Sequence, residues 1–183
     1  MSSRGFDPTR LDVEAFAAEE GELGGRWPLA GFDRLRASAA SESPPTAADE
    51  VAWQARGERV ALRGGLHETW LHLAAETKIA LQCQRCLAPV DVVLAIERKF
   101  LFVHGEDAAA QLDASREDDV LALTRALDLR ELVEDELLLA LPLVPLHDAC
   151  PAPLSVATDE GSAQERPNPF AALAALKRDG PVN

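Results

Sequence analysis

The feature that most constrains the fold is a change of hydrophobic period near residue 46. Between residues 51 and 102, apolar side chains recur at every second position, which is the period of a strand with one buried face. These positions are Val51, Trp53, Ala55, Leu71, Leu73, Ala75, Ile79, Leu81, Val90, Val92, Leu94, Ile96, Phe100 and Phe102, and Thr77 lies on the same face. Turn-forming segments at Gly64-Gly65 and at 83–89 divide the stretch into three runs. The pattern predicts an antiparallel meander with one buried face.

The pattern changes again towards the C-terminal half. We expect residues 104–119, which are polar and acidic, to form a solvated loop, and residues 120–123 to form a short strand. A helix is predicted over residues 128–141, because Asp128 and Glu131 have the spacing of a capping box and Pro142 ends the pattern. Its apolar stripe consists of Leu129, Leu132, Val133, Leu137, Ala140 and Leu141.

Two flanking segments differ from this central part. In residues 1–45 we expect an arm with a short helix at 11–17, stopped by Gly24-Gly25, and an extended stretch that inserts Trp27 into the body. Residues 151–167 have the composition of a flexible linker, and Phe170, Leu173 and Leu176 have helical spacing in a last helix.

These elements predict an α+β fold. Its parts are an antiparallel twisted sheet or partial β-barrel packed by one central helix, and a C-terminal helix on a linker. The domain organisation that we expect is an N-terminal extended and helical arm at 1–45, an α+β core at 46–150, and the linker and helix at 151–183.

Charge is distributed unevenly along the chain. The formal net charge is −13, but residues 51–104 carry seven basic and five acidic side chains. Only this region can meet RNA without a large electrostatic penalty. The predicted contact residues are Lys78, Arg85, Arg98 and Lys99, on the solvated sheet face and hairpin tip. The alternative is that these basic residues belong to an ordinary solvated sheet face that contacts no RNA.

Three consecutive acids, Glu134, Asp135 and Glu136, lie on the predicted helix. Consecutive helical positions point about 100° apart, so these side chains cannot converge on one substrate. They form either a solvated helix face or an acidic docking site for a basic partner.

Four residues are of the types that bind structural zinc. Cys83 and Cys86, and His147 and Cys150, are two pairs with two intervening residues each, a spacing that suits structural Cys₃His zinc. Such a zinc would fix the helix exit to the sheet. Two alternatives are a reduced thiol pair beside an unrelated histidine, and CxxC redox chemistry, which the absence of a βαβ pattern disfavours.

Other functional classes lack support in the sequence. The chain contains no GxSxG, Gly-rich phosphate loop or HExxH motif, so we expect no enzyme and no small-molecule substrate. The N-terminal residues show no apolar signal segment, and no apolar run approaches the ~18 residues that span a bilayer. We therefore expect a cytoplasmic protein without membrane contact.

Three segments, in this order, resemble the bacterial YceD family. They are Leu81–Val90 (LQCQRCLAPV), Val133–Asp148 (VEDELLLALPLVPLHD) and Asn168–Lys177 (NPFAALAALK), and the resemblance extends from about Trp27 to Lys177. The family is named for large ribosomal RNA subunit accumulation. The resemblance implies a non-enzymatic factor in large-subunit biogenesis that supports synthesis, processing or stability of 23S ribosomal RNA. Its partner would be ribosomal RNA, or alternatively a basic large-subunit ribosomal protein that the acidic chain escorts.

Overall fold

The computed structural model describes residues 5–151 of the 183-residue chain. Within this range the elements are α1 (Val13–Ala18), β1 (Glu22–Pro28), η1 (Leu29–Gly31), α2 (Asp33–Ala37), β2 (Glu50–Ala61), η2 (Arg63–Gly65), β3 (His67–Gln82), β4 (Pro89–Val103), α3 (Glu106–Asp113), β5 (Asp119–Ala122) and α4 (Leu129–Leu139). The predicted flexible linker and C-terminal helix lie, from residue 152 onwards, outside the described residues.

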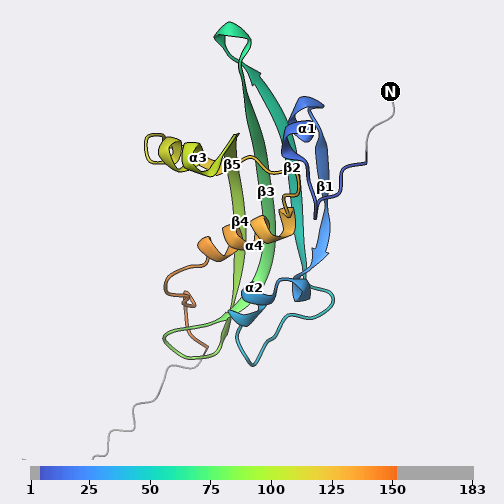
Figure 1. Cartoon of the computed structure of the whole chain (residues 1–183). Coiled ribbons are helices and arrows are strands. Elements are labelled where there is room, and N and C mark those ends of the chain that lie inside the picture. The colour runs from blue at the N-terminus through green and yellow to red at the C-terminus, as the bar shows by residue number, and fades with distance from the viewer. Residues whose placement is uncertain (1–4, 152–183) are drawn as a thin grey trace, which may run out of the picture. The chain divides into compact units, whose positions relative to one another are not determined.

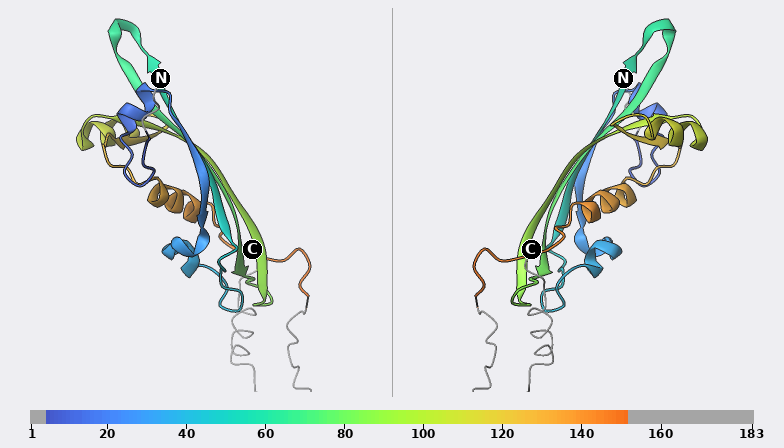
Figure 2. Two further views of the ribbon diagram at one scale, coloured as in Figure 1. Left: turned by 90° about the vertical axis from the view of Figure 1, so that its right-hand side faces the viewer. Right: turned by 90° about the vertical axis from the view of Figure 1, so that its left-hand side faces the viewer.

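One sheet organises the described part of the chain. Its five strands lie in sequence order, and all neighbours are antiparallel except β4 and β5. The sheet is open and strongly twisted, as Figures 1 and 2 show. The predicted α+β class is therefore confirmed, and of the two predicted forms the chain adopts the open sheet.

The buried face of the sheet has the predicted parity. Leu71, Leu73, Ala75, Thr77, Ile79 and Leu81 of β3 are all buried, and the residues between them are not. Helices α1, α2 and α4 lie on this side of the sheet (Figure 2). Leu129, Val133 and Leu137 of α4 are fully buried in the same core, which confirms most of the predicted helix stripe. The Asp128 side chain caps α4 by accepting hydrogen bonds from the N–H groups of Arg130 and Glu131.

The N-terminal residues contribute an edge strand to the sheet. β1 pairs with β2, and the Trp27 ring stacks on Trp53 with centroids 4.1 Å apart, as the predicted insertion of Trp27 requires. α1 approaches β2 so closely that a Cβ at Gly57 would lie 2.8 Å from the Ala17 backbone. The domain boundaries given above stay a prediction.

Two local predictions were wrong. Gly24-Gly25 lies inside β1, because β2 supplies the backbone partners that hold these glycines in an extended strand. Residues 104–119 are not only a loop, because they contain α3. Ala109 of α3 is buried against Leu101 in a second small cluster. This tertiary burial selects a helix in a segment whose polar composition indicates a loop.

No helix among residues 5–151 is long and apolar enough to cross a membrane.

Candidate functional site

The predicted metal ligands converge at one end of the sheet. Cys83 and Cys86 lie in the turn between β3 and β4, and His147 and Cys150 lie in the segment that follows α4. One ligand atom from each of the four lies within 4.8 Å of the other three. A backbone hydrogen bond from the Gln84 N–H to the Pro145 carbonyl, at 2.9 Å, ties the two segments together next to the cluster. The sequence spacing thus led to a real three-dimensional cluster.

The His147 ring is oriented as a metal ligand would be. Its Nε2 lies 3.0 Å from the Pro89 carbonyl oxygen, which can only accept, so Nε2 carries the proton. The Nδ1 atom faces the Cys86 Sγ at 3.4 Å, and in a neutral ring it is the nitrogen that can coordinate a metal. Second-sphere hydrogen bonds of this kind fix the tautomer of zinc-bound histidines.

The surroundings of the cysteines also favour a metal. Burial alone would raise the pKa of the Cys83 thiol. The N–H groups of Cys86, His147 and Arg85 donate to its sulfur, however, and together with the His147 ring they lower the pKa to about 5. Burial, followed by hydrogen bonding to Cys86 and Cys83, raises the pKa of Cys150. A mixed set of thiolate, thiol and imidazole donors in a confined volume is the chemistry that a divalent metal satisfies. The four residues therefore form a Cys₃His cluster whose geometry could hold a metal ion.

The turn that carries the first cysteine pair has an unusual backbone. Leu87 has a φ of 63°, in the left-handed region that favours glycine, and its side chain is 52% exposed. The Leu87 N–H donates to the Cys83 carbonyl at 2.9 Å, and the Cys83 N–H donates to the Ala88 carbonyl at 3.0 Å. The turn that presents Cys83 and Cys86 is thus held by its own hydrogen bonds despite this conformational cost.

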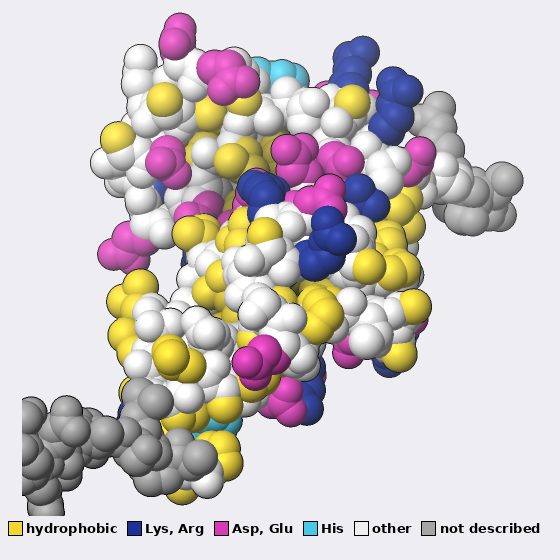
Figure 3. Space-filling model, turned by 90° about the horizontal axis from the view of Figure 1, so that it is seen from below, with side chains coloured by type: hydrophobic (Ala, Val, Ile, Leu, Met, Phe, Trp, Pro, Cys, Tyr) yellow, Lys and Arg dark blue, Asp and Glu magenta, His cyan; other side chains and the backbone are white. Residues whose placement is uncertain are grey.

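The four predicted basic contact residues differ in whether they form ion pairs within the fold. Lys78 pairs with Asp91 at 2.7 Å, and the Arg98 Nε donates to Glu136 at 2.8 Å. Lys99 and Arg85 form no ion pair with any residue of the described range, although the Arg85 guanidinium lies 3.9 Å from the Cys150 sulfur. Over the face seen in Figure 3, basic and acidic side chains lie side by side.

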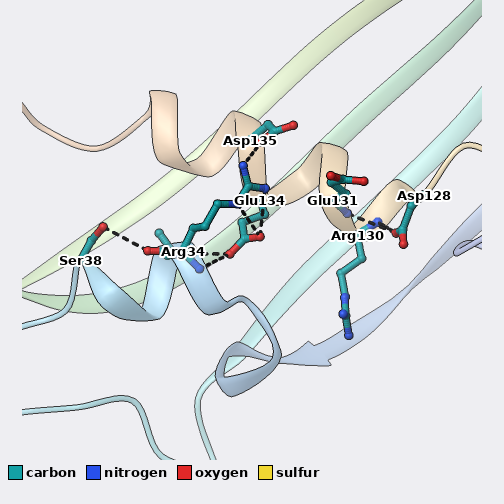
Figure 4. A network of polar contacts seen from close by, with 8 residues as sticks. Arg34, Ser38, Asp128, Arg130, Glu131, Glu134 and Asp135 are labelled. Carbon is teal, nitrogen blue, oxygen red and sulfur yellow. Dashed lines mark hydrogen bonds and ion pairs between the residues drawn. The ribbon is translucent and has the colours of Figure 1, made fainter.

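The three consecutive acids of α4 are occupied within the fold. Glu134 accepts hydrogen bonds from the Arg34 and Leu35 N–H groups at 2.8 and 3.1 Å, and it also pairs with the Arg34 guanidinium (Figure 4). Asp135 binds the other side of the same guanidinium. Glu136 is buried and pairs with Arg98. Glu134 and Asp135 thus share the Arg34 guanidinium, whereas Glu136 binds Arg98, so the three side chains do not all converge on one point.

Arg34 is the residue that sequence reasoning missed. It lies in α2, 100 residues before Glu134, and no spacing in the sequence connects the two. Phe32, at the N-terminal end of α2, has no capping side chain, so Glu134 supplies the missing acceptor from another helix. An uncapped helix start is the one local signal that an acceptor must come from elsewhere.

Comparison with known proteins gives the family. A model of the family "Large ribosomal RNA subunit accumulation protein YceD" matches residues 71–177, which is more than half of the chain. The chain belongs to the YceD family. The match begins in β3, and within it lie the cysteine turn, α4 and the His147–Cys150 segment.

A curated YceD relative supports this assignment. The chain is 38% identical over 114 residues to the large ribosomal RNA subunit accumulation protein YceD of Haemophilus influenzae. The alignment covers 55% of this chain and 60% of the relative. No solved structure matches the chain.

Proposed function

We propose that this YceD-family chain is a non-enzymatic, cytoplasmic factor in large ribosomal subunit biogenesis. In this role it supports synthesis, processing or stability of 23S ribosomal RNA. The observation that carries the proposal is family membership, because the family and the Haemophilus influenzae relative are named for large ribosomal RNA subunit accumulation.

The ion pairs of α4 favour an RNA partner over the escort of a basic ribosomal protein. An escort would need accessible acids, whereas Glu134 and Glu136 are engaged with Arg34 and Arg98. For RNA we propose contacts through Lys78, Arg85, Arg98 and Lys99, led by Arg85 and Lys99, whose charges no carboxylate of residues 5–151 neutralises. The convergence of His147 and Cys150 on Cys83 and Cys86 favours a metal site over CxxC redox chemistry, which requires only the cysteine pair.

Depletion and complementation test the proposed function. Cells depleted of the protein should have a lower ratio of 23S to 16S ribosomal RNA, and expression of the full chain should restore it. An unchanged ratio would reject the proposal. To test the escort alternative, Asp135→Lys is the suitable reversal, because Asp135 is half-exposed and binds only the Arg34 side chain. Loss of a bound ribosomal protein in this variant, with RNA association intact, would favour the escort.

We also propose that Cys83, Cys86, His147 and Cys150 hold a structural zinc ion. The zinc would fix the segment after α4 to the β3–β4 turn. Protein purified without chelator should contain one zinc per chain, and Cys86→Ser should lose both the zinc and thermal stability. Ser155→Ala, at a residue outside the ligand set, is the matched control and should keep the metal. Metal-free protein with the same melting temperature as metal-loaded protein would reject the zinc site.

A further inference from the structure

The β2–β3 tip, residues 59–67, is a two-stranded ribbon that extends beyond the other strands (Figure 1). β1 pairs with β2 only as far as Arg56, and β4 pairs with β3 only as far as Thr69. Every residue from 61 to 67 is exposed. Packing within the described fold therefore does not explain which side chains occur on this ribbon.

The tip concentrates positive charge in an acidic chain. Arg59 and Arg63 give residues 59–67 a formal charge of +2, whereas the whole chain has a charge of −13. The acids that flank this range, Glu58 and Glu68, pair with Arg56 at 3.8 Å and with Arg116 at 3.0 Å. Neither arginine forms an ion pair with a residue in the range 5–151, in contrast to Lys78 and Arg98. The two guanidinium groups are thus available to an external anion.

The end of the ribbon adds apolar surface and accessible backbone. Leu62 and Leu66 are 45% and 66% exposed, and the Leu62 N–H donates to the Leu66 carbonyl at 2.8 Å. Between them Gly64 and Gly65 have φ values of 82° and 78°, which L-residues with side chains rarely adopt. A partner can therefore approach the backbone of this turn closely, with one leucine on each side.

We propose that the β2–β3 tip is a contact site for folded RNA, an inference that rests on the proposed function. Arg59 and Arg63 bind phosphate groups, and Leu62 and Leu66 lie against ribose or base faces. A ribbon whose strands are about 4.8 Å apart fits the wide, shallow minor groove of an RNA helix or an open loop. Glu58 and Glu68, next to the tip, are engaged with Arg56 and Arg116. The acids of distant segments do not oppose this contact strongly, because charges are screened over about 8 Å at physiological salt.

The tip and the cysteine turn, which carries the proposed contact Arg85, lie at opposite ends of β3. β3 joins the two ends and has 16 residues, which corresponds to roughly 50 Å at about 3.3 Å per residue. An RNA that reaches both ends must therefore be extended or folded over a comparable distance. An anionic lipid surface would suit the same four side chains, but the naming of the family for ribosomal RNA favours RNA.

Binding of the full chain to 23S ribosomal RNA transcribed in vitro tests the tip directly. The double variant Arg59→Glu with Arg63→Glu should weaken binding at least tenfold and reduce the log–log salt slope by about 1–2. The control Arg125→Glu with Arg130→Glu makes the same charge change at two exposed residues outside the tip, and should weaken binding far less. Equal weakening in both variants would overturn the proposal, because it would reflect net charge alone.

The apolar component has its own test. Leu62→Ser with Leu66→Ser should weaken RNA binding several-fold and leave the salt slope unchanged, because no charge is removed. Melting temperatures should stay unchanged in all these variants, since the substituted side chains are exposed. If the wild-type chain binds phosphatidylglycerol vesicles through the tip but does not bind the RNA, the RNA proposal is wrong.

Complementation separates a failure of the tip from a failure of the proposed function. In depleted cells the wild-type chain should restore the 23S to 16S ratio, and the Arg59→Glu, Arg63→Glu variant should restore less of it. Full restoration by this variant would overturn the tip proposal alone. An unaltered ratio in the depleted cells would instead reject the proposed function.

Discussion

Removal of the Glu134 carboxylate should detach α2 from α4. In the structure this side chain is largely buried and accepts hydrogen bonds from the Arg34 and Leu35 N–H groups, in addition to its ion pair with Arg34. It therefore serves as the cap of α2, whose own preceding residue, Phe32, cannot provide one. Glu134→Ala leaves both N–H groups without this acceptor.

The expected loss can be worked out from these contacts. Losing a capping acceptor costs about 1–2 kcal/mol of unfolding free energy. The ion pair with Arg34, which is half-exposed, adds about 0.2–1 kcal/mol. The sum of about 2 kcal/mol corresponds to a fall in melting temperature of roughly 4–8 °C for a domain of this size.

Asp135→Ala is the matched control for this variant. Asp135 is the next residue on the same helix and binds the same guanidinium, but it contacts no backbone N–H group of α2. Its loss should cost less than about 1 kcal/mol, because both partners are half-exposed. Glu134→Gln should be intermediate, since the amide oxygen can still accept from the two N–H groups. Thermal unfolding followed by circular dichroism gives the ranking, and equal effects of Glu134→Ala and Asp135→Ala would refute the capping role.

Three further substitutions test other parts of the fold. Leu137→Asp places a carboxylate at a fully buried position of α4 and should destabilise the domain by several kcal/mol; an unchanged melting temperature would contradict the packing of α4 on the sheet. Leu87→Gly should stabilise the protein by up to about 1 kcal/mol in urea unfolding, because glycine adopts the positive φ without steric cost; destabilisation would mean that this leucine side chain packs usefully. Arg98→Ala removes the partner of the buried Glu136 and should cost about 1–3 kcal/mol in the same assay, whereas Lys99→Ala, next to it on the exposed face, should be nearly neutral.

Much of the candidate metal site could be predicted because it depends on short-range spacing. Each cysteine or histidine pair has two residues between its members, and each pair lies next to an element end that the sequence also indicates. What the spacing could not show is the orientation of the His147 ring. The Pro89 carbonyl sets that orientation. Pro89 is the first residue of β4 and lies 58 residues before His147, so no local spacing connects the two.

For the charged residues, the sequence could not predict which charges are available to a partner. Lys78 and Arg98 carry the same formal charge in the sequence as Lys99 and Arg63, but the fold neutralises the first two in ion pairs with Asp91 and Glu136. Whether a charge is available to a partner depends on which residues from distant segments lie within about 4 Å of it. Local patterns contain no information of that kind.

The sequence by itself determined the strands β2, β3 and β4, their buried face and the central helix. Alternation of period two and the Asp128 cap act over a few residues, so the chain encodes them locally. Only the tertiary structure decided that Gly24-Gly25 continues a strand and that residues 106–113 form a helix. In both places the partner, β2 or the Leu101 cluster, supplies hydrogen bonds or buried contacts that outweigh a weak local preference. The capping of α2 by Glu134 has the same physical origin, because it requires two helices to meet that are about 100 residues apart.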